Sequence, residues 1–515
     1  MTEERRVNMT YNFKTEHTQL EYKEAKKTFP NEAWKTICAF SNTKGGLMVL
    51  GIAEIEGEFA VTGVESPEKI KKEYLDTLNS DSKINLTSLG EDSIEIKEYI
   101  DGKKVIEIRV PEASYKEKPI YLNGQANQTY IRRGSGDYIV NEDELATFFR
   151  NKIDNLDEDL IENYDMDDLD SITIDNYIER LVVRDKHNRY VNMEKHQILS
   201  ELGVIRRDRK TKKEALTFGG LLFFGKYDSI KEYLPHFHLE YIDLTNTSFS
   251  KEERYKDRVS SGSINFPNLN LYNFYFEVQK RLSENIKDIF SLNPETMIRE
   301  ENATKTNAVL REALANTIIH ADYKANQDVK IEVFNHYYDF TNPGKMRVST
   351  REFFEENKSK PRNAIIEVLF RKIGISERMG SGGITIYTNV VEQKLRLPEL
   401  KSENNTTSLR VWKVDIADSD PELSEREKTV LKYITKKKII ASADVMKLLG
   451  VKRDASLSVL NGLIDKGYLS KHGQTRSIKY HINEKYEDEI ATMEHMIREL
   501  KLLRKQKDKR KTTKK

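Results

Sequence analysis

The chain has 515 residues, 37% of them hydrophobic and 33% charged, with a formal net charge of only +1. This length predicts three or four compact units. The charge balance excludes a global field that would draw the protein to nucleic acid, so such binding must come from local basic patches. The single cysteine, Cys38, excludes an intramolecular disulfide and fits a reducing cytosol. The N-terminus has no apolar signal core and no apolar run reaches the roughly 18–20 residues of a membrane span, so we expect a soluble, cytoplasmic protein without a membrane partner.

Periodicity and composition predict a multidomain chain of α/β and α+β units. The predicted segments are, in chain order, an α/β unit over 14–150, an acidic linker over 151–170, an intermediate α+β region over 171–290, a second α/β domain over 291–415, three helical segments with a hairpin over 422–484, and a helix with a basic tail over 485–515.

Two carboxylates and a lysine lie close together near the N-terminus. Glu16 and Glu21 are five residues apart, and Lys23 follows them. Folding could bring both carboxylates to one divalent ion, because hard cations such as Mg²⁺ or Mn²⁺ prefer oxygen ligands. A lysine beside them could stabilise phosphate charge. The spacing by itself also fits a solvated charged face.

The segments that follow this motif add to the pattern. Residues 39–46 read AFSNTKGG, the buried strand after them ends at residues 51–52 (GI), and residues 130–135 read YIRRGS. Together with residues 16–23, this order resembles the Schlafen AlbA family over roughly residues 14–150. The resemblance implies an AlbA-like α/β fold for this unit.

Two activities are implied by the resemblance. One is nucleic-acid binding without chemistry, with Arg132 and Arg133 of the closing strand as contacts. The other is metal-dependent RNA cleavage by a site of three carboxylates.

The residues of the cleavage site match the family only in part. Glu16 and Glu21 match the first two carboxylates and would bind the metal, while Lys23 would stabilise charge on the phosphate. The family has an aspartate where this chain has Ala53, so Glu54 would have to serve as the third ligand with a longer reach. The departure favours binding over cleavage.

A helix with a polar stripe is predicted over residues 310–323. Glu312, Asn316 and His320 recur at four-residue spacing and therefore share one face. An amide and a carboxylate on one face suit a magnesium–nucleotide site, because the amide oxygen can coordinate the metal and the carboxylate can polarise a water molecule. The alternative is a helix with ordinary polar exposure.

Two glycine-containing turns follow this helix. In the first, Asn342 and Gly344 flank a proline at the end of a strand. In the second, Gly380, Ser381 and Gly382 belong to a glycine-rich loop that enters a helix, where backbone amides can cradle phosphates. A single glycine loop is a weak signal, but the ordered set is specific.

The ordered set resembles the GHKL ATP-binding fold of gyrase, histidine kinases and MutL, over about residues 295–415. The resemblance implies that Asn316 coordinates Mg²⁺, that Glu312 acts as the general base, and that both loop glycines belong to a phosphate lid. Asn342 stands where the superfamily has its adenine-reading aspartate. The resemblance therefore implies the fold more strongly than it implies a preference for adenine or hydrolysis of ATP. The chain has no G-x4-G-K-[ST] phosphate loop, which excludes a helicase.

The C-terminal segments have the order of a winged helix-turn-helix and resemble that family in layout. Helices are predicted over 423–434, 441–449 and 452–466, with a hairpin over 471–482. Winged helices also mediate protein contacts, which is the alternative here.

Specific contacts follow from this layout. Lys452, Arg453 and Ser456 begin the predicted recognition helix and would meet base edges, while Arg476 on the wing would contact phosphate. The basic tail would add sequence-independent affinity or act only as a solubilising segment. The helical pattern before it is a possible seam for a homo-oligomer.

Two functional hypotheses result. In the first, the protein is an ATP-binding and nucleic-acid-binding regulatory or defence protein, whose nucleotide state gates the Schlafen-type unit. In the second, it is a metal-dependent endoribonuclease acting on tRNA-like substrates, with a toxin or antiphage role. The intact Glu16, Glu21 and Lys23 favour the second, and Ala53 favours the first.

Overall fold

The computed structural model describes residues 15–483, apart from residues 56, 81, 100–101, 185–188, 246–253, 287–290, 293–298, 301, 356–357, 376–380, 404 and 474–477. The chain divides into two compact units, one ending at Asp154 and the other beginning at Asn155. The helix and basic tail predicted over 485–515 lie outside the described residues. Among the described helices, none is long and apolar enough to cross a membrane.

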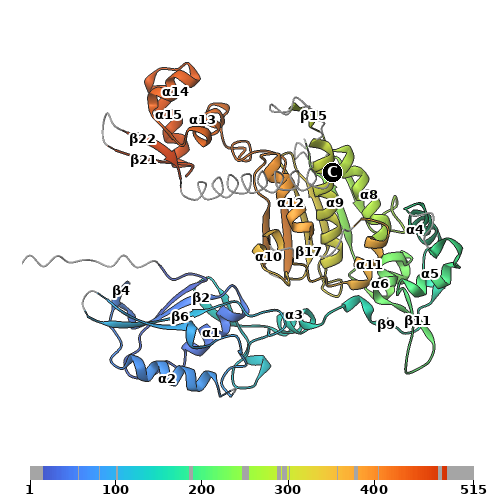
Figure 1. Ribbon diagram of the computed structural model, residues 1–515, viewed down its shortest axis with the longest axis horizontal. Coiled ribbons are helices and arrows are strands. Elements are labelled where there is room, and N and C mark those ends of the chain that lie inside the picture. The colour runs from blue at the N-terminus through green and yellow to red at the C-terminus, as the bar shows by residue number, and fades with distance from the viewer. Residues whose placement is uncertain are drawn as a thin grey trace, which may run out of the picture. The chain divides into compact units, whose positions relative to one another are not determined.

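The first unit is a four-stranded mixed sheet with helices (Figure 1). Its sheet has the order β1-β2-β6-β5, with β1 parallel to β2 and the other pairs antiparallel. Its elements are β1 (Leu20–Lys23), α1 (Ala33–Asn42), β2 (Gly46–Leu50), β3 (Ile52–Ile55), β4 (Glu58–Val61), α2 (Pro67–Leu78), β5 (Ile94–Glu98), β6 (Lys104–Val110), β7 (Tyr130–Arg133), β8 (Gly136–Ile139) and α3 (Glu142–Lys152).

The turn between α1 and β2 requires glycine. Gly45 has a φ of +69°, and a Cβ there would lie 2.6 Å from the carbonyl oxygen of Val110. Such a conformation strains any L side chain, so Gly45 is needed at the turn that brings β2 against β6. The helix before it is almost entirely buried, and Trp34 stacks on Tyr74 with ring centroids 5.6 Å apart.

The second unit begins with small elements and then forms a six-stranded sheet. Before the sheet come β9 (Leu160–Ile161), α4 (Ser171–Arg184), α5 (Lys195–Glu201), β10 (Ile205–Arg207), β11 (Glu214–Thr217), α6 (Phe218–Phe224) and α7 (Tyr227–Tyr233). The sheet and its helices comprise β12 (Leu239–Asp243), β13 (Asp257–Ser260), α8 (Leu271–Glu284), β14 (Ser291–Leu292), β15 (Arg299–Glu300), α9 (Asn302–His320), β16 (Val329–Val333), β17 (Tyr337–Pro343), α10 (Thr350–Glu355), α11 (Ala364–Lys372), α12 (Ser381–Glu392), β18 (Glu399–Glu403) and β19 (Thr406–Trp412).

The sheet has the order β13-β12-β16-β17-β19-β18, and α9 packs on β16 and β17 (Figure 1). Strand β12 pairs in parallel with β16, although β12 lies in the region predicted as 171–290 and β16 in that predicted as 291–415. One hydrophobic core runs from Ile161 to Val411. The predicted boundary near residue 290 therefore does not separate two cores, because neither half can bury its sheet face alone.

The stretch predicted as an acidic linker, 151–170, is packed rather than extended. Of its apolar side chains, Ile153 is exposed, whereas Leu156, Ile161 and Leu169 are buried. Low apolar content suggested a linker, but the spacing of the three buried side chains places each one in a core. The boundary between the two units falls inside the predicted linker, after Asp154, but the residues from Leu156 onward pack into the second unit.

An acidic residue of that stretch anchors it to helix α11. Asp157 is fully buried, and its Oδ2 accepts a hydrogen bond of 2.9 Å from the backbone N–H of Ile366 in the first turn of α11. Burial raises the pKa of this carboxyl group to about 7, although the backbone N–H donors oppose the shift. Asp157 thus caps the N-terminus of α11: it accepts from a free backbone N–H group and lies at the positive end of the helix dipole.

The C-terminal part has the element order predicted for a winged helix. It consists of α13 (Glu425–Lys437), β20 (Ile439–Ile440), α14 (Ser442–Leu449), α15 (Arg453–Asp465), β21 (Leu469–His472) and β22 (Lys479–Ile482), with the strand order β20-β22-β21. Ser424 and Glu427 form a capping box that starts α13, and Gly450 in the left-handed conformation ends α14.

The buried carboxyl group of Asp157 predicts a distinct pH dependence of stability. Because its pKa is raised in the folded state, its contribution is fully present below the unfolded pKa and is lost as the pH rises through about 7. We expect the melting temperature of wild type to fall more between pH 5 and pH 8 than that of Asp157→Asn, measured by scanning calorimetry. Asp157→Ala, which also loses the cap, should be less stable at every pH by about 1 kcal/mol or more. Parallel pH profiles for wild type and Asp157→Asn would contradict the assignment.

Candidate functional site

The polar stripe of α9 faces the start of α12. Asn316 donates a hydrogen bond of 3.1 Å from Nδ2 to Oε1 of Glu312. Gly382, in the first turn of α12, lies so close that an added Cβ would be 1.9 Å from Glu312 Oε1 and 2.8 Å from Asn316 Nδ2. The fold therefore brings Gly382 next to Glu312 and Asn316, so three of the predicted nucleotide residues lie together.

The other predicted residues of this site lie partly outside the described chain. Gly380 is not described, and Ser381 is described only as the first residue of α12. Asn342 is buried at the end of β17, and its Nδ2 donates to the carbonyl oxygen of Pro343 at 2.9 Å. Gly344 follows with a φ of +95°, which explains the glycine at this turn.

A buried arginine joins the end of α9 to this turn. Arg362 is 1% exposed, donates from Nε to the carbonyl oxygen of His320 at 3.1 Å, and donates from Nη2 to that of Lys345 at 2.9 Å. A Cβ on Gly344 would lie 2.7 Å from the same Nη2. The glycine therefore allows the guanidinium to seal the space between α9 and β17.

The electrostatics at this end of the stripe keep His320 neutral. Burial, followed by the charges of Arg362 and Arg347, lowers the pKa of His320 to about 4. His320 is consequently a neutral imidazole at pH 7, while two guanidiniums remain charged beside it.

The N-terminal acidic motif forms an ion-pair network. Glu21 is buried, and its Oε1 accepts from Lys23 Nζ at 2.7 Å while its Oε2 accepts from Arg132 Nη2 at 2.5 Å. Arg132 also pairs with Asp137 at 2.9 Å and lies over the ring of Phe40, 5.1 Å from its centroid. The carboxylate of Glu21 is thus neutralised by cations from β1 and β7.

The remaining residues of the motif do not complete a metal site. Oε1 of Glu16 accepts the backbone N–H of Tyr22 at 2.9 Å, and burial raises the pKa of the Glu16 carboxyl group despite that bond. Glu54 is exposed on β3, opposite Phe59 of β4. Over the described part of the chain, no three acidic, histidine or cysteine side chains are grouped as metal ligands. The predicted set of Glu16, Glu21 and Glu54 is therefore not assembled.

The predicted nucleic-acid contacts of the first unit differ in accessibility. The side chain of Arg132 is only 1% exposed, so the prediction that it contacts nucleic acid is wrong in this conformation, because its charge serves Glu21 and Asp137. Arg133, the next residue of β7, points the other way on the strand, is 53% exposed and pairs with Glu144.

The start of α15 also divides into exposed and buried residues. Lys452 and Arg453 are exposed and available to a partner. Ser456 is fully buried, with its Oγ donating to the carbonyl oxygen of Arg453 at 2.8 Å, so the prediction that it meets a base is wrong. Arg476 lies outside the described residues.

Sequence reasoning missed Arg362 and Asp157 as organising residues. Arg362 stood in a basic KPRN segment and Asp157 in an acidic run, and both look like surface charges in sequence. No local sequence pattern marks these residues, because the partners of Arg362 lie 17 and 42 positions away and that of Asp157 lies 209 positions away.

Three family models match parts of the chain. Residues 16–141 match "Schlafen, AlbA_2", residues 146–240 match a domain of unknown function (DUF8451), and residues 326–411 match "Putative ATP-dependent DNA helicase recG C-terminal". The last match includes Asn342 and Gly382 but begins after α9, which carries Glu312 and Asn316.

Similarity to whole proteins is weaker. No curated protein matches the chain. The crystal structure of the DIP2311 protein from Corynebacterium diphtheriae is similar at 15% identity over 93% of this chain and 94% of that chain, with a TM-score of 0.39, a level that supports no argument. The family matches and the fold together identify a multidomain α/β chain with a Schlafen AlbA_2 domain at residues 16–141 and an ATPase-like domain of the recG C-terminal type at residues 326–411.

Proposed function

We propose that this protein is a nucleic-acid-binding regulatory or defence protein in which an ATP-binding domain controls the Schlafen AlbA domain. The two domain matches support a nucleic-acid-related, ATP-binding protein. The observation that carries the finer proposal is the contact of Gly382 with the Glu312–Asn316 pair. This contact places the carboxylate of Glu312 and the amide of Asn316 against α12, the helix that follows the glycine-rich loop.

The pairing of these side chains suits a magnesium–nucleotide complex. Asn316 uses its amide nitrogen for Glu312, and this orientation leaves its carbonyl oxygen for a hard cation such as Mg²⁺. Glu312, held by that hydrogen bond, would accept a proton from an attacking water molecule. Asn342 and Gly344 would border the base, with the neutral amide of Asn342 in place of a carboxylate.

The segment that follows the AlbA domain connects it to the proposed nucleotide site. The second unit begins at Asn155, and the backbone N–H of Leu156 donates to the carbonyl oxygen of Arg362 at 3.2 Å. The guanidinium of the same Arg362 holds the end of α9 and the turn at Gly344. A change of nucleotide state at this turn would therefore act directly on the segment to which the AlbA domain is attached.

The ion pairs of Glu21 in the acidic motif weigh against the endoribonuclease alternative. A metal-binding Glu21 would have to leave Arg132 and Lys23, and a buried guanidinium that loses its partner is costly. The acidic motif is better explained as the anchor that fixes β7 against β1, leaving nucleic-acid binding as the activity of this domain.

Replacing the amide should weaken nucleotide binding. Asn316→Ala removes the proposed magnesium ligand, and we expect a loss of roughly 10-fold or more in affinity for Mg²⁺–ATP, the effect of losing a charge-assisted contact. Glu312→Gln should retain binding and lose any turnover. Calorimetric titration with ATP and Mg²⁺ measures the first, and phosphate release the second. Asn461→Ala, on the exposed face of α15, is the matched control. Equal affinities for wild type and Asn316→Ala would remove the basis of the assignment.

The close approach of α12 gives an independent test. In Gly382→Ala the new methyl group would meet Glu312 Oε1, and the carboxylate can rotate away only by breaking its bond to Asn316. We expect weaker Mg²⁺–ATP binding in a folded protein, measured by calorimetry and circular dichroism. Gly90→Ala is the control, because a Cβ at Gly90 meets no atom within 4 Å. The idea fails if both variants bind ATP like wild type.

The acidic motif can be tested by stability and cleavage together. Glu21→Gln leaves the buried Arg132 with Asp137 alone, and we expect the first unit to lose about 1–3 kcal/mol of stability. Glu54→Gln, at an exposed position, should change the melting temperature little. The nuclease alternative predicts instead that both variants abolish manganese-dependent cleavage of tRNA by an active wild type. Cleavage by wild type that both substitutions abolish would therefore favour the nuclease.

A further inference from the structure

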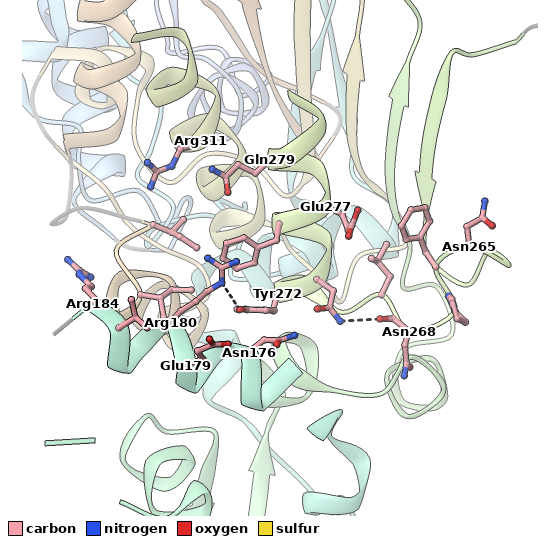
Figure 2. A pocket seen from close by; sticks show the side chains of 18 residues that line it. Asn176, Glu179, Arg180, Arg184, Asn265, Asn268, Tyr272, Glu277, Gln279 and Arg311 are labelled. Atoms are coloured by element: carbon pink, nitrogen blue, oxygen red, sulfur yellow. Dashed lines mark hydrogen bonds between the residues drawn. The ribbon is translucent and has the colours of Figure 1, made fainter. Parts of the chain in front are cut away.

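A large cavity lies in the second unit, away from the proposed nucleotide residues. Its volume is about 1000 Å³, and it is lined by α4, the segment 265–269, α8, Arg311 of α9, and Ile373 and Ile375 after α11 (Figure 2). None of Glu312, Asn316 or Gly382 lines it. A space of this size accommodates a ligand of nucleotide dimensions.

Three guanidiniums converge on this cavity. Arg180 and Arg184 are four residues apart on α4 and share one face of that helix. Arg184 and Arg311 meet at Gly374: a Cβ on Gly374 would lie 2.9 Å from Arg184 Cζ, and Arg311 Nη2 donates to the Gly374 carbonyl oxygen at 3.4 Å. In Figure 2 the three arginines lie on the side of the cavity away from Asn265 and Asn268.

These arginines have no acidic partner among the described residues. Arg180 donates to the hydroxyl of Tyr272 at 3.0 Å, and Arg184 donates to backbone carbonyl oxygens after α11. In the described part of the chain, the three arginines bond only to a hydroxyl and to backbone carbonyl oxygens, and Nε of Arg311 is buried without a hydrogen-bond partner. Clustered guanidiniums that share no carboxylate repel one another until an anion joins them.

The acidic side chains on the cavity wall do not cancel this charge. Glu277 pairs at 2.6 Å with Arg281, which also pairs with Asp257 at 2.7 Å, so Glu277 is partly compensated. Glu179 is exposed at the rim on α4, next to Arg180. Among the described lining residues, three guanidiniums stand against two carboxylates, one of them paired with Arg281, so these residues carry a net positive charge.

The remaining lining suits a nucleoside. The guanidinium of Arg180 is stacked on Phe276, 3.9 Å from the ring centroid, which fixes its plane and leaves both terminal amino groups as donors. Phe266 and Tyr272 add aromatic surface, and the side-chain amides of Asn176 and Gln279 can read the edge of a base.

We propose that this cavity is a second anion site that binds a 5′-polyphosphorylated nucleoside without a metal ion, either free or at the end of an RNA strand. Arg180, Arg184 and Arg311 hold the phosphates through bidentate hydrogen bonds, and the aromatic and amide side chains hold the nucleoside. Guanidiniums neutralise the phosphates directly, so binding needs no Mg²⁺. The proposal is independent of the ATP site at Asn316.

The test is calorimetric titration of the full chain in EDTA with three probes: pyrophosphate, guanosine triphosphate and a 5′-triphosphorylated tetranucleotide. We expect at least one probe to bind wild type, and Arg180→Gln and Arg311→Gln each to bind it at least about 10-fold more weakly. Arg180 is exposed, so its variant remains informative if loss of Arg311 impairs folding. Arg206→Gln, whose arginine is paired with Glu158 at 3.0 Å, is the matched control.

The outcomes separate this proposal from the ATP site. Asn316→Ala should bind the probes in EDTA like wild type, even where it no longer binds Mg²⁺–ATP. Tighter binding of the tetranucleotide than of guanosine triphosphate identifies a strand end as the ligand, and the reverse identifies a free nucleotide. The proposal is overturned if wild type binds none of the probes in EDTA, or if both glutamine variants bind as tightly as Arg206→Gln.

Discussion

The second unit depends on the burial of one guanidinium. Arg362 is almost inaccessible to solvent, yet it carries a full charge, and it is satisfied by the carbonyl oxygens of His320 and Lys345. A buried charge of this kind is tolerated only when hydrogen bonds replace its hydration. The end of α9 and the turn at Gly344 must both stay in place for those hydrogen bonds to form, and the backbone carbonyl oxygen of Arg362 also accepts from the N–H of Leu156. The proposed nucleotide site and the start of the second unit therefore meet at the same residue, the first through the guanidinium of Arg362 and the second through its backbone carbonyl oxygen.

The first unit repeats this principle with an ion-pair network. Arg132 reaches across from β7 to Glu21 on β1 and also binds Asp137, so residues more than 100 positions apart share one buried charge centre. Carboxylates committed in this way are poor candidates for metal binding, because releasing them would leave Arg132 uncompensated. The charged residues that look most catalytic in sequence are here the ones that hold the domain together.

Three arginines that form no ion pair with a carboxylate of the described residues have a different role. Arg180, Arg184 and Arg311 line a cavity instead of a sealed interior, and their donors are only partly used by backbone and tyrosine oxygens. Within one unit, a guanidinium thus serves either as a sealed support, as at Arg362, or as part of an open surface for anions. Burial and the nature of the partners distinguish the two roles.

The sequence by itself determined the local patterns. The glycine turn at residues 45–46, the stripe of Glu312 and Asn316, the loop glycine Gly382 and the helical order of the C-terminal part follow from short-range spacing, which one sequence displays directly. Tertiary structure alone decided which charges are buried. The burial of Arg132 and of Asp157 depends on partners more than 100 positions away, which a linear pattern does not display. The pairing of β12 with β16 likewise joined two predicted domains into one sheet. Solvation free energy depends on the three-dimensional surroundings of a charge, and a linear pattern does not specify those surroundings.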